Sequence, residues 1–274
     1  MVDDARRHAS YPLSLPKIDV NVANTARTWN YMVGGKDNFA ADREAARQLV
    51  MVAPVMVAAA LASRAFLRRT VRYLVGGAGI RQFLDIGTGL PTAGSTHEVA
   101  QSISPECRVV YVDNDPVVLT HARALLTSAP EGATSYIDAD ARDPHAIIAE
   151  AGRTLDFTRP VAIIMVDLLN FIRDNQTVHF IMSALIDAVP SRSHCAIMHP
   201  ASDLDPAMLE AERRWNRLAP QKIRLRSRAE VAALVDGLVP VEPGLVTVSE
   251  WRPDEAELAP AQLVPLYGVV ARKP

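Results

Sequence analysis

Cysteine, aromatic residues and excess charge of either sign are all scarce in this sequence. Its 274 residues include two cysteines, Cys107 and Cys195, which lie far apart and in no spacing typical of a metal or redox site. We therefore expect reduced, mostly buried thiols of a cytoplasmic protein. The formal net charge of −2 gives no reason to expect nucleic acid as a partner. Basic residues recur at helical spacing from Arg64 to Arg72, and we interpret them as a solvated helix face.

Long apolar runs are also missing. The longest, from Leu49 to Ala62, is too short to cross a bilayer and contains Pro54, so we interpret it as a buried helix. No apolar segment follows the charged residues at the N-terminus, and neither a signal peptide nor a membrane association is expected. The sequence leaves the oligomeric state open.

The order of the expected elements predicts an α/β fold. Residues 1–18 lack periodicity and should form a flexible arm, residues 19–76 a helical extension or lid, and residues 77–274 a ligand-binding domain. Strand-like and helix-like segments alternate in that last part, which predicts a mainly parallel sheet with helices on both faces. The expected strands are residues 82–86, 109–112, 134–137, 161–166, 195–198, 239–242 and 266–272.

The stretch FLDIGTGLP, at residues 83–91, is the most informative part of the chain. It predicts a buried strand that runs into a glycine turn at Gly87, Thr88 and Gly89, followed by a helix from about Ser95 to Ile103. Glycines let the backbone approach a ligand, and the N-terminus of a helix adds partial positive charge. A nucleotide cofactor site is therefore expected, with a turn that binds nothing as the alternative.

Two residues favour S-adenosylmethionine (SAM) over a nicotinamide dinucleotide in this loop. The dinucleotide fingerprint requires glycine or alanine at the position that Thr92 occupies, counted from Gly87. That fingerprint also gives no role to Asp85, whereas the ammonium group of a methionine moiety would pair with it.

The next expected strand ends in Asp113, about 20 residues beyond the glycines. An acid at this place binds a ribose diol in nucleotide-binding sheets. Asp113 is therefore the ribose candidate, and Asn114 beside it joins the expected cofactor contacts. Asp115 precedes Pro116 and is interpreted as a helix cap.

A third acid follows the third expected strand. Asp140 is placed to accept a hydrogen bond from an adenine amino group, with backbone of Ala141 and Arg142 beside it. Asp138 is the alternative, because strand register is not fixed by sequence to within a residue or two.

These motifs lie in a chain that resembles an actinobacterial family of SAM-dependent methyltransferases, long carried as a domain of unknown function. The resemblance covers nearly everything beyond about residue 20 and is carried by residues 26–43, 83–98, 109–126, 242–253 and 267–274. It implies a Rossmann-like class I methyltransferase fold with seven strands, the last antiparallel, and with N-terminal helices over the cofactor. It supplies no methyl acceptor.

Candidates for catalysis come from the ends of the fourth and fifth expected strands. Asp167 and His199 are the possible general bases, and Asp167 is also a possible cofactor contact; each has an alternative as a structural residue. Asn170 stands where members of the family often carry histidine, and an amide cannot act as a base near neutral pH. The catalytic residue therefore stays unassigned.

A glycine-rich segment in the extension is the candidate lid. The candidate substrate or lid residues are Tyr31, Gly34, Gly35, Lys36, Asn38 and His97. A turn with two glycines can close over a ligand. It can equally be a helix C-cap at Gly34. No second histidine follows His97 at the spacing of a zinc helix, so no metal is expected.

The sequence thus predicts a SAM-dependent methyltransferase that releases S-adenosylhomocysteine and acts on an unidentified acceptor, for which a small molecule is the favoured class. Methyl transfer is an in-line displacement, so alignment and exclusion of water matter more than strong acid–base chemistry. A SAM-binding sensor or partner subunit without catalysis is one alternative, and an NAD(P)-dependent oxidoreductase is the other, less favoured one.

Overall fold

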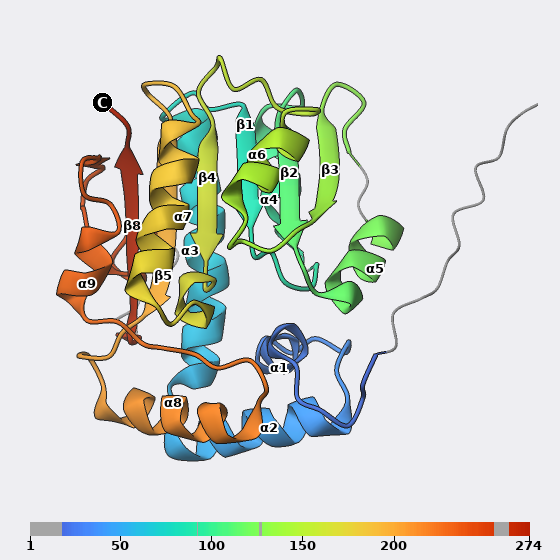
Figure 1. The fold of residues 1–274 in the computed structure, drawn as a ribbon, viewed down its shortest axis with the longest axis vertical. Helices are drawn as coiled ribbons and strands as arrows, with labels where there is room; N and C mark the ends of the chain where they lie inside the picture. The colour runs from blue at the N-terminus through green and yellow to red at the C-terminus, as the bar shows by residue number, and fades with distance from the viewer. Residues whose placement is uncertain (1–17, 92, 126–127, 255–262) are drawn as a thin grey trace, which may run out of the picture.

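A computed structural model describes residues 18–91, 93–125, 128–254 and 263–274. The arm expected over residues 1–18 therefore lies almost entirely outside the described residues. The described chain forms one twisted sheet with helices on both faces and a helical cap at one end (Figure 1).

The sheet has the strand order β3-β2-β1-β4-β5-β8-β6, and a short β7 also pairs with β8. Its strands are β1 (Gln82–Ile86), β2 (Arg108–Asp113), β3 (Ala133–Asp138), β4 (Ala162–Val166), β5 (His194–Pro200), β6 (Val239–Pro240), β7 (Val246–Thr247) and β8 (Leu266–Arg272). Strands β1 to β5 pair in parallel, while β8 runs antiparallel to β5. The mainly parallel sheet with an antiparallel last strand is confirmed. The extra β7 was missed because two residues are too few to produce an alternating pattern.

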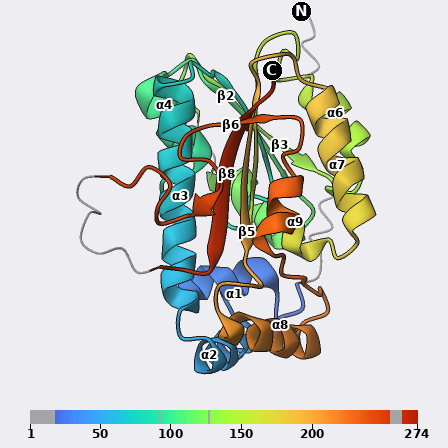
Figure 2. The ribbon, with the colours of Figure 1, turned by 90° about the vertical axis from the view of Figure 1, so that its left-hand side faces the viewer.

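Two apolar cores fill the spaces between the sheet and its helices. One face is covered by α3 (Met56–Gly76) and α4 (Thr96–Ile103), and the other by α6 (Pro144–Ala151), α7 (Asn175–Asp187) and α9 (Arg228–Ala233), as Figure 2 shows. Successive residues of β1 alternate between these cores: Phe83 packs under α3, and Leu84 packs toward α7. The central strands are thus buried on both faces, which explains their unbroken apolar runs.

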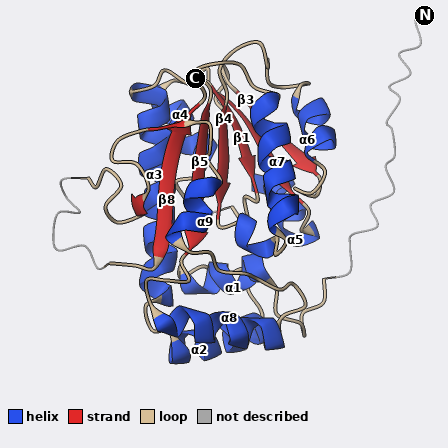
Figure 3. Cartoon of the chain, turned by 60° about the vertical axis from the view of Figure 1, so that its left-hand side comes forward, coloured by secondary structure: helices blue, strands red, loops and turns tan. Residues whose placement is uncertain are grey.

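A third core builds the cap beyond the carboxyl ends of the strands. Helices α1 (Thr25–Met32), α2 (Ala40–Val52) and α8 (Pro206–Leu218) meet there around Leu49 and Trp215 (Figure 3). Helix α8 follows β5, so the cap includes a segment of the expected residue 77–274 domain. Helix α3, by contrast, packs on the sheet. The sequence led us to expect a helical extension before residue 77 and a domain after it. The packing instead groups α1, α2 and α8 in the cap and places α3 with the sheet.

The junction of α2 and α3 corrects one expectation. The apolar run from Leu49 to Ala62 is not a single buried helix but two helices that meet at 105° near Pro54. Proline lacks the backbone N–H and disfavours helical backbone in the residue before it, so the helix ends here. Met51 and Leu61 are exposed on either side of the bend. None of the described helices alone is long and apolar enough to cross a membrane, although α2 and α3 together pass by length and composition.

Helix α1 is held to α2 by a buried ion pair. Arg27 Nε lies 2.8 Å from Asp42 Oδ2, and the other carboxylate oxygen accepts from the backbone N–H of Asn24. Asn24 in turn caps α1, because its side chain accepts from the backbone N–H of Arg27. Removing one member of a buried pair leaves an uncompensated charge, which costs about 3–5 kcal/mol. These contacts with α2 therefore fix the position of α1 relative to the sheet.

Candidate active site

A cavity of about 440 Å³ lies between the carboxyl ends of the parallel strands and the cap. Its volume is in the range of about 300–1,000 Å³ that small-molecule sites occupy. Strand ends of β1, β2 and β4 line one side, and residues of α1, α3 and α8 line the other. It gathers seven residues expected to bind cofactor: Asp85, Gly87, Thr88, Gly89, Asp113, Asn114 and Asp167.

The loop after β1 needs its two glycines for different reasons. Gly87 has φ of +77°, and a Cβ there would lie 2.7 Å from Leu168 Cδ1. Gly89 has φ of +62° but open space where its Cβ would be. Both backbones are in the left-handed region, which glycine adopts without strain. The open side of Gly89 is what a ligand lying against the backbone requires.

Asp113, at the end of β2, faces this loop. Its Oδ2 accepts from the backbone N–H of Gly89 and its Oδ1 from that of Asp115, each at 2.9 Å. Burial raises the pKa of Asp113, and these two hydrogen bonds oppose the rise. A carboxylate has about four acceptor sites, so each oxygen can accept one more hydrogen bond. Two hydroxyls of a ribose diol would supply those bonds.

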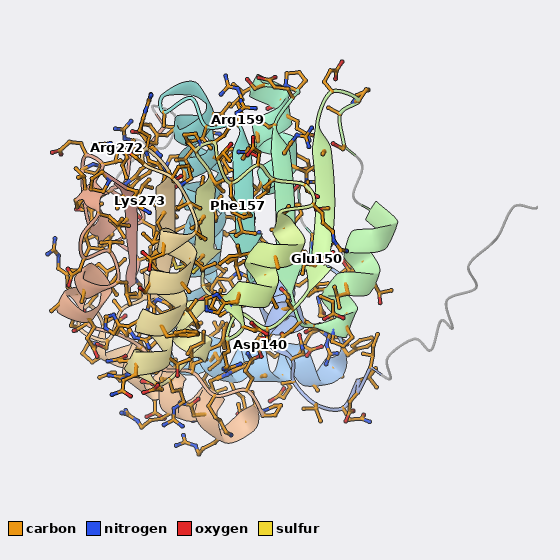
Figure 4. The ribbon with its side chains drawn as sticks, turned by 45° about the horizontal axis from the view of Figure 1, so that its top comes forward. Asp140, Glu150, Phe157, Arg159, Arg272 and Lys273 are labelled. Carbon is orange, nitrogen blue, oxygen red and sulfur yellow. The ribbon has the colours of Figure 1, made fainter. Side chains whose placement is uncertain are left out.

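A second, smaller cavity of about 40 Å³ adjoins the first at Gly87 and Asp113. Asp140 and Ala141 line it, whereas Asp138 is exposed and lines neither cavity. Figure 4 shows Asp140 at the cap end of the molecule, with Arg159 and Arg272 at the opposite end. Of the two aspartates left open by the sequence, the structure thus brings Asp140 to the site.

Asp85 sits on β1 beside a cation that the sequence did not assign to the site. Thr96 Oγ1 donates to Asp85 Oδ2 at 2.6 Å. Burial raises the pKa of Asp85 to about 6, against the influence of Thr96 and of the Arg64 guanidinium. Arg64 lines the cavity, and its buried Nε has no hydrogen-bond partner among the described residues.

The basic stripe from Arg64 to Arg72 is therefore not a solvated face as expected. Arg64 turns into the cavity, and Arg69 is buried, donating to the backbone oxygens of Val248 and Trp251. Only part of the stripe remains at the surface, where Arg72 pairs with Asp254. Charge spacing alone could not separate these positions, because tertiary packing around α3 decides which of them face the cavity, the core or solvent.

Asp167 follows β4 in an unusual backbone conformation. Its φ is +57°, a value that non-glycine residues adopt at a cost and that recurs at functional sites. Burial raises its pKa to about 7, and Arg64 and Asn170 act in the opposite direction. Its Oδ1 has no partner among the described residues. A carboxylate with a pKa near neutral, in a cavity, has the properties of a general base.

The family follows from comparison with known proteins. A sequence model described as S-adenosyl methyltransferase matches residues 13–274. The chain belongs to this family of S-adenosyl methyltransferases. It is a SAM-dependent methyltransferase with the class I fold that its sequence predicted.

Two solved structures are similar over almost the whole chain. A DUF574 family protein from Streptomyces avermitilis has 41% identity and a TM-score of 0.91, covering 94% of this chain and 100% of that one. A candidate methyltransferase from Thermobifida fusca has 37% identity and a TM-score of 0.85, covering 96% and 99%. The mitomycin 7-O-methyltransferase, at 18% identity and a TM-score of 0.51, covers 90% of this chain and 68% of its own, and shares the fold alone. No curated protein matches the chain.

His199, one of the two possible bases expected from the sequence, does not face the cavity of the methyltransferase. His199 is fully buried and lines neither cavity. Its Nδ1 lies 2.8 Å from the backbone oxygen of Pro200, and its Nε2 lies 2.8 Å from Arg226 Nη1. Arginine can only donate, so Nε2 is the acceptor and the ring is neutral. Burial, chiefly, lowers its pKa to about 3. Its lone pair is engaged, and a strand end near the cleft was not enough to predict where the ring points.

His97 does not line the methyltransferase cavity either, but it contacts a residue that does. The hydroxyl of Tyr111 accepts from the backbone N–H of His97 at 2.8 Å and lies 2.9 Å from its Nδ1. Tyr111 lines the cavity and His97 does not. The histidine thus positions the tyrosine ring that forms part of the wall.

The glycine-rich segment of the methyltransferase ends α1 rather than lining the cavity. Gly34, with φ of +82°, donates to the backbone oxygen of Tyr31, and Gly35 donates to that of Asn30. This is a Schellman C-cap, the alternative that the sequence left open. Residues Tyr31, Gly34, Gly35, Lys36 and Asn38 line neither cavity.

The segment still acts on the site through Asn30. Asn30 does line the cavity, and its Oδ1 accepts from the backbone N–H of Asp37 and from Asn38 Nδ2, both at 3.0 Å. A Cβ on Gly35 would lie 2.3 Å from the Asn30 side chain. The glycine-rich segment therefore holds the side chain of Asn30, which lines the methyltransferase cavity, in place.

Sequence reasoning missed the wall contributed by α8. Its residues Met208, Ala211, Glu212 and Trp215 line the methyltransferase cavity. The apolar face of an amphipathic helix is equally typical of ordinary core packing, so the sequence held no signal that separated the two. No group of three or more metal-ligating side chains occurs in the part of the chain that the structure describes.

Proposed function

We propose that this methyltransferase binds SAM along β1, β2 and β3 and transfers its methyl group to a small molecule held against α8. The observation that carries the proposal is Asp113, whose two oxygens are fixed by backbone N–H groups and keep two acceptor sites for a ribose diol. Asp113 also lines both cavities, as a residue between ribose and adenine subsites must.

The adenine ring is assigned to the smaller cavity. Asp140 would accept from its amino group, beside the backbone of Ala141. In the absence of a ligand Asp140 accepts from Arg142 Nη1 at 3.0 Å and from Asn114 Nδ2 at 3.3 Å. These surface contacts are weak because solvent screens them, so a ligand can replace them at small cost.

The methionine end is assigned to the main cavity beyond Gly87 and Gly89. Its carboxylate would pair with Arg64, whose Nε lacks a partner among the described residues, and its ammonium with Asp85. The N-terminus of α4 opens on the same end of the cavity at Ser95 and Thr96 and adds favourable charge for an anion. The charges of this half of the cavity thus match a zwitterion.

A sulfonium methyl group, when bound, supplies an electrophile that needs no further activation. The chain's own residues have to align the acceptor, exclude water and remove a proton where the acceptor carries one. Helix α1 covers the cavity and excludes water, and Asp167 is the group that can take a proton. The enclosure by α1 and α8 favours a small molecule over a macromolecule as the acceptor.

Calorimetric titration with SAM, S-adenosylhomocysteine and NADH tests this assignment. We expect micromolar binding of the first two, weakened about tenfold or more by Asp113→Ala because hydrogen bonds to a charged group are lost. Asp138→Ala is a matched control: Asp138 is the register partner of Asp113 on β3 but is exposed and lines neither cavity. Equal effects of the two substitutions, or preference for NADH, would overturn the assignment.

Arg64→Gln tests the methionine end separately. It should weaken both SAM and S-adenosylhomocysteine but leave the binding of adenosine, which lacks the amino acid, unchanged. Arg72→Gln, two turns further along α3 and partly exposed, is the control. A loss of adenosine binding in Arg64→Gln would indicate general damage to the site instead.

A further inference from the structure

The cavity continues past the place assigned to the cofactor. Strand β4 lies in the middle of the sheet, with β1 on one side and β5 on the other. The ends of β1 and β2 carry the residues assigned to the cofactor. On the other side of β4, the cavity wall is formed by Pro200, the last residue of β5, and by α8. The end of β4, at Asp167 and Asn170, is thus the border between the two halves, where a methyl group would be transferred.

The half beyond this border is apolar. Its walls are formed by Met32, Met56, Met208, Trp215 and Leu225, from α1, α3, α8 and the segment after α8. Methionines adapt to the shape of a flat or irregular ligand, and tryptophan offers a large rigid face. A ligand body that buries apolar surface, such as an aromatic ring system, fits these walls.

The charges in this half all have one sign. Asp167 and Glu212 line it, and Arg64 is the only basic side chain among the described residues that line the whole cavity. Arg64 acts on both Asp85 and Asp167, more strongly on Asp85 on the cofactor side, and it is the group assigned above to the methionine carboxylate. A carboxylate or phosphate on the acceptor would therefore face Asp167 and Glu212, while the one cation that lines the cavity is assigned to the cofactor.

Acceptor oxygens without donors lie at the border. Asn170 is 3% exposed and lines the cavity, and its Oδ1 has no hydrogen-bond partner in the part of the chain that the structure describes. The Oδ1 of the neighbouring Asp167 also has none. A buried acceptor without a donor is costly, so these atoms indicate a ligand that donates. A phenol has one hydrogen to donate, whereas a primary amine, charged or neutral, has two or three.

From these observations we infer that the methyl acceptor is an apolar amine, with its nitrogen at Asp167 and Asn170 and its body against the methionines and Trp215. The inference rests on the proposed function, since it places the amine opposite the cofactor half. Asp167 binds the ammonium form and then takes one proton from it. The nitrogen lone pair attacks the methyl carbon, the carbon–sulfur bond breaks, and its electron pair stays on the sulfur of the thioether product.

Three ligands with one ring test the inference. Tryptamine, tryptophol and indole-3-acetate share the indole ring and differ in carrying an ammonium, a hydroxyl or a carboxylate. Each is titrated by calorimetry into the protein saturated with S-adenosylhomocysteine. We expect tryptamine to bind more tightly than tryptophol by about tenfold, and indole-3-acetate not to bind.

Two variants assign the contact. Asp167→Asn keeps the size of the side chain and tolerates the left-handed backbone, and it should weaken tryptamine by about ten- to a hundredfold while tryptophol changes little. Glu150→Gln removes a carboxylate of α6 that lies at the surface (Figure 4) and pairs with Arg153. This substitution should change the binding of neither ligand. Melting curves of each variant show whether it remains folded.

Each outcome decides the matter. Equal or tighter binding of indole-3-acetate, absence of binding by all three ligands, or tryptamine binding that Asp167→Asn leaves unchanged would overturn the amine assignment. The S-adenosylhomocysteine titration is read first and independently. If that ligand does not bind, the proposed function fails, whereas a bound cofactor product without preference for the amine overturns only this inference.

Discussion

Asn24 Nδ2 donates to Asp115 Oδ2 at 2.5 Å, which joins the cap of α1 to the residue that begins α5 (Pro116–Leu125) across 91 positions of sequence. Both residues line the cavity. Asp115 also accepts from the backbone N–H of Val117, so it has the helix-cap role expected from sequence. The hydrogen bond holds the N-terminus of α1 against the N-terminus of α5 at the cavity, and each partner also caps its own helix.

This contact should control how fast the cofactor product leaves. Asn24→Ser keeps a side chain that caps a helix well but is too short to reach Asp115. We expect a melting temperature within a few degrees of wild type and dissociation of S-adenosylhomocysteine faster by about tenfold, measured by stopped-flow displacement. Asn24→Asp, which also caps but opposes two carboxylates, should dissociate at least as fast. Wild-type dissociation rates in both variants would show that α1 does not retain the ligand.

The two loop glycines should respond differently to alanine. Gly87→Ala meets both the left-handed backbone and Leu168, so we expect a loss of about 2–5 kcal/mol in the free energy of unfolding. Gly89→Ala should lose only the cost of the left-handed backbone, about 1–2 kcal/mol in the free energy of unfolding. It should weaken ligand binding, because it places a methyl group in the open space against which a ligand would lie. Urea unfolding and calorimetry should thus separate them. Equal losses of stability would contradict the packing of Leu168 on Gly87.

Asp167 should make stability depend on pH in a definite direction. Its pKa is raised from 3.8 to about 7 in the folded protein, so between these values the folded state binds more protons than the unfolded state. Stability from this group therefore falls as pH rises from about 4 to 7. Each pKa unit corresponds to about 1.4 kcal/mol, and Asp167→Asn should be more stable than wild type by about 2–4 kcal/mol at pH 8.

That advantage should disappear near pH 4, where both proteins carry an uncharged side chain. Chemical unfolding at several pH values measures it, and Asp138→Asn, at an exposed position, serves as the control. A difference between Asp167→Asn and wild type that does not vary with pH would show that the carboxyl of Asp167 titrates normally.

His199→Ala should reduce stability without removing a catalytic base. The substitution leaves a cavity and deprives buried Arg226 Nη1 of one acceptor, although the backbone oxygen of Leu169 remains at 2.7 Å. We expect a loss of about 2–5 kcal/mol in urea unfolding. Binding of S-adenosylhomocysteine to the folded fraction should stay within about threefold of wild type, a difference of under about 0.7 kcal/mol. A variant as stable as wild type but unable to turn over would instead support a role in catalysis.

The outcome for individual residues shows what the sequence could and could not predict. The strands from β1 to β5 were predictable because burial on both faces gives apolar runs, and their carboxyl ends necessarily meet at one edge. Asp85, Asp113 and Asp140 lie at that edge for the same reason. Side-chain direction was not predictable: His199 lies next to the last residue of β5 but turns inward to Arg226, whereas Arg64, on a helix, turns into the cavity. The direction of such a side chain depends on partners that are distant in sequence, and the local sequence does not reveal which residues these are.

The role of Gly34 and Gly35 was also not predictable from the local sequence. Two adjacent glycines are compatible with a helix C-cap and with a lid, and only Gly34 of the pair has a left-handed backbone. What separated them was Asn30, whose side chain occupies the space beside Gly35. That neighbour belongs to the preceding helix and would have been a possible signal, since asparagine in a helix is often there for its hydrogen bonds.

The origin of α8 has a consequence for how such enzymes can diversify. Part of the wall of the proposed acceptor half, including Met208, Glu212 and Trp215, comes from the 13 residues of α8, whereas most residues of the proposed cofactor half come from the ends of β1, β2 and β3. Substitutions or a transplanted helix at residues 206–218 can therefore exchange one acceptor preference for another while the methyl-donor half is inherited unchanged. A series of relatives, or a library confined to this helix, would then differ in what they methylate and agree in what they consume.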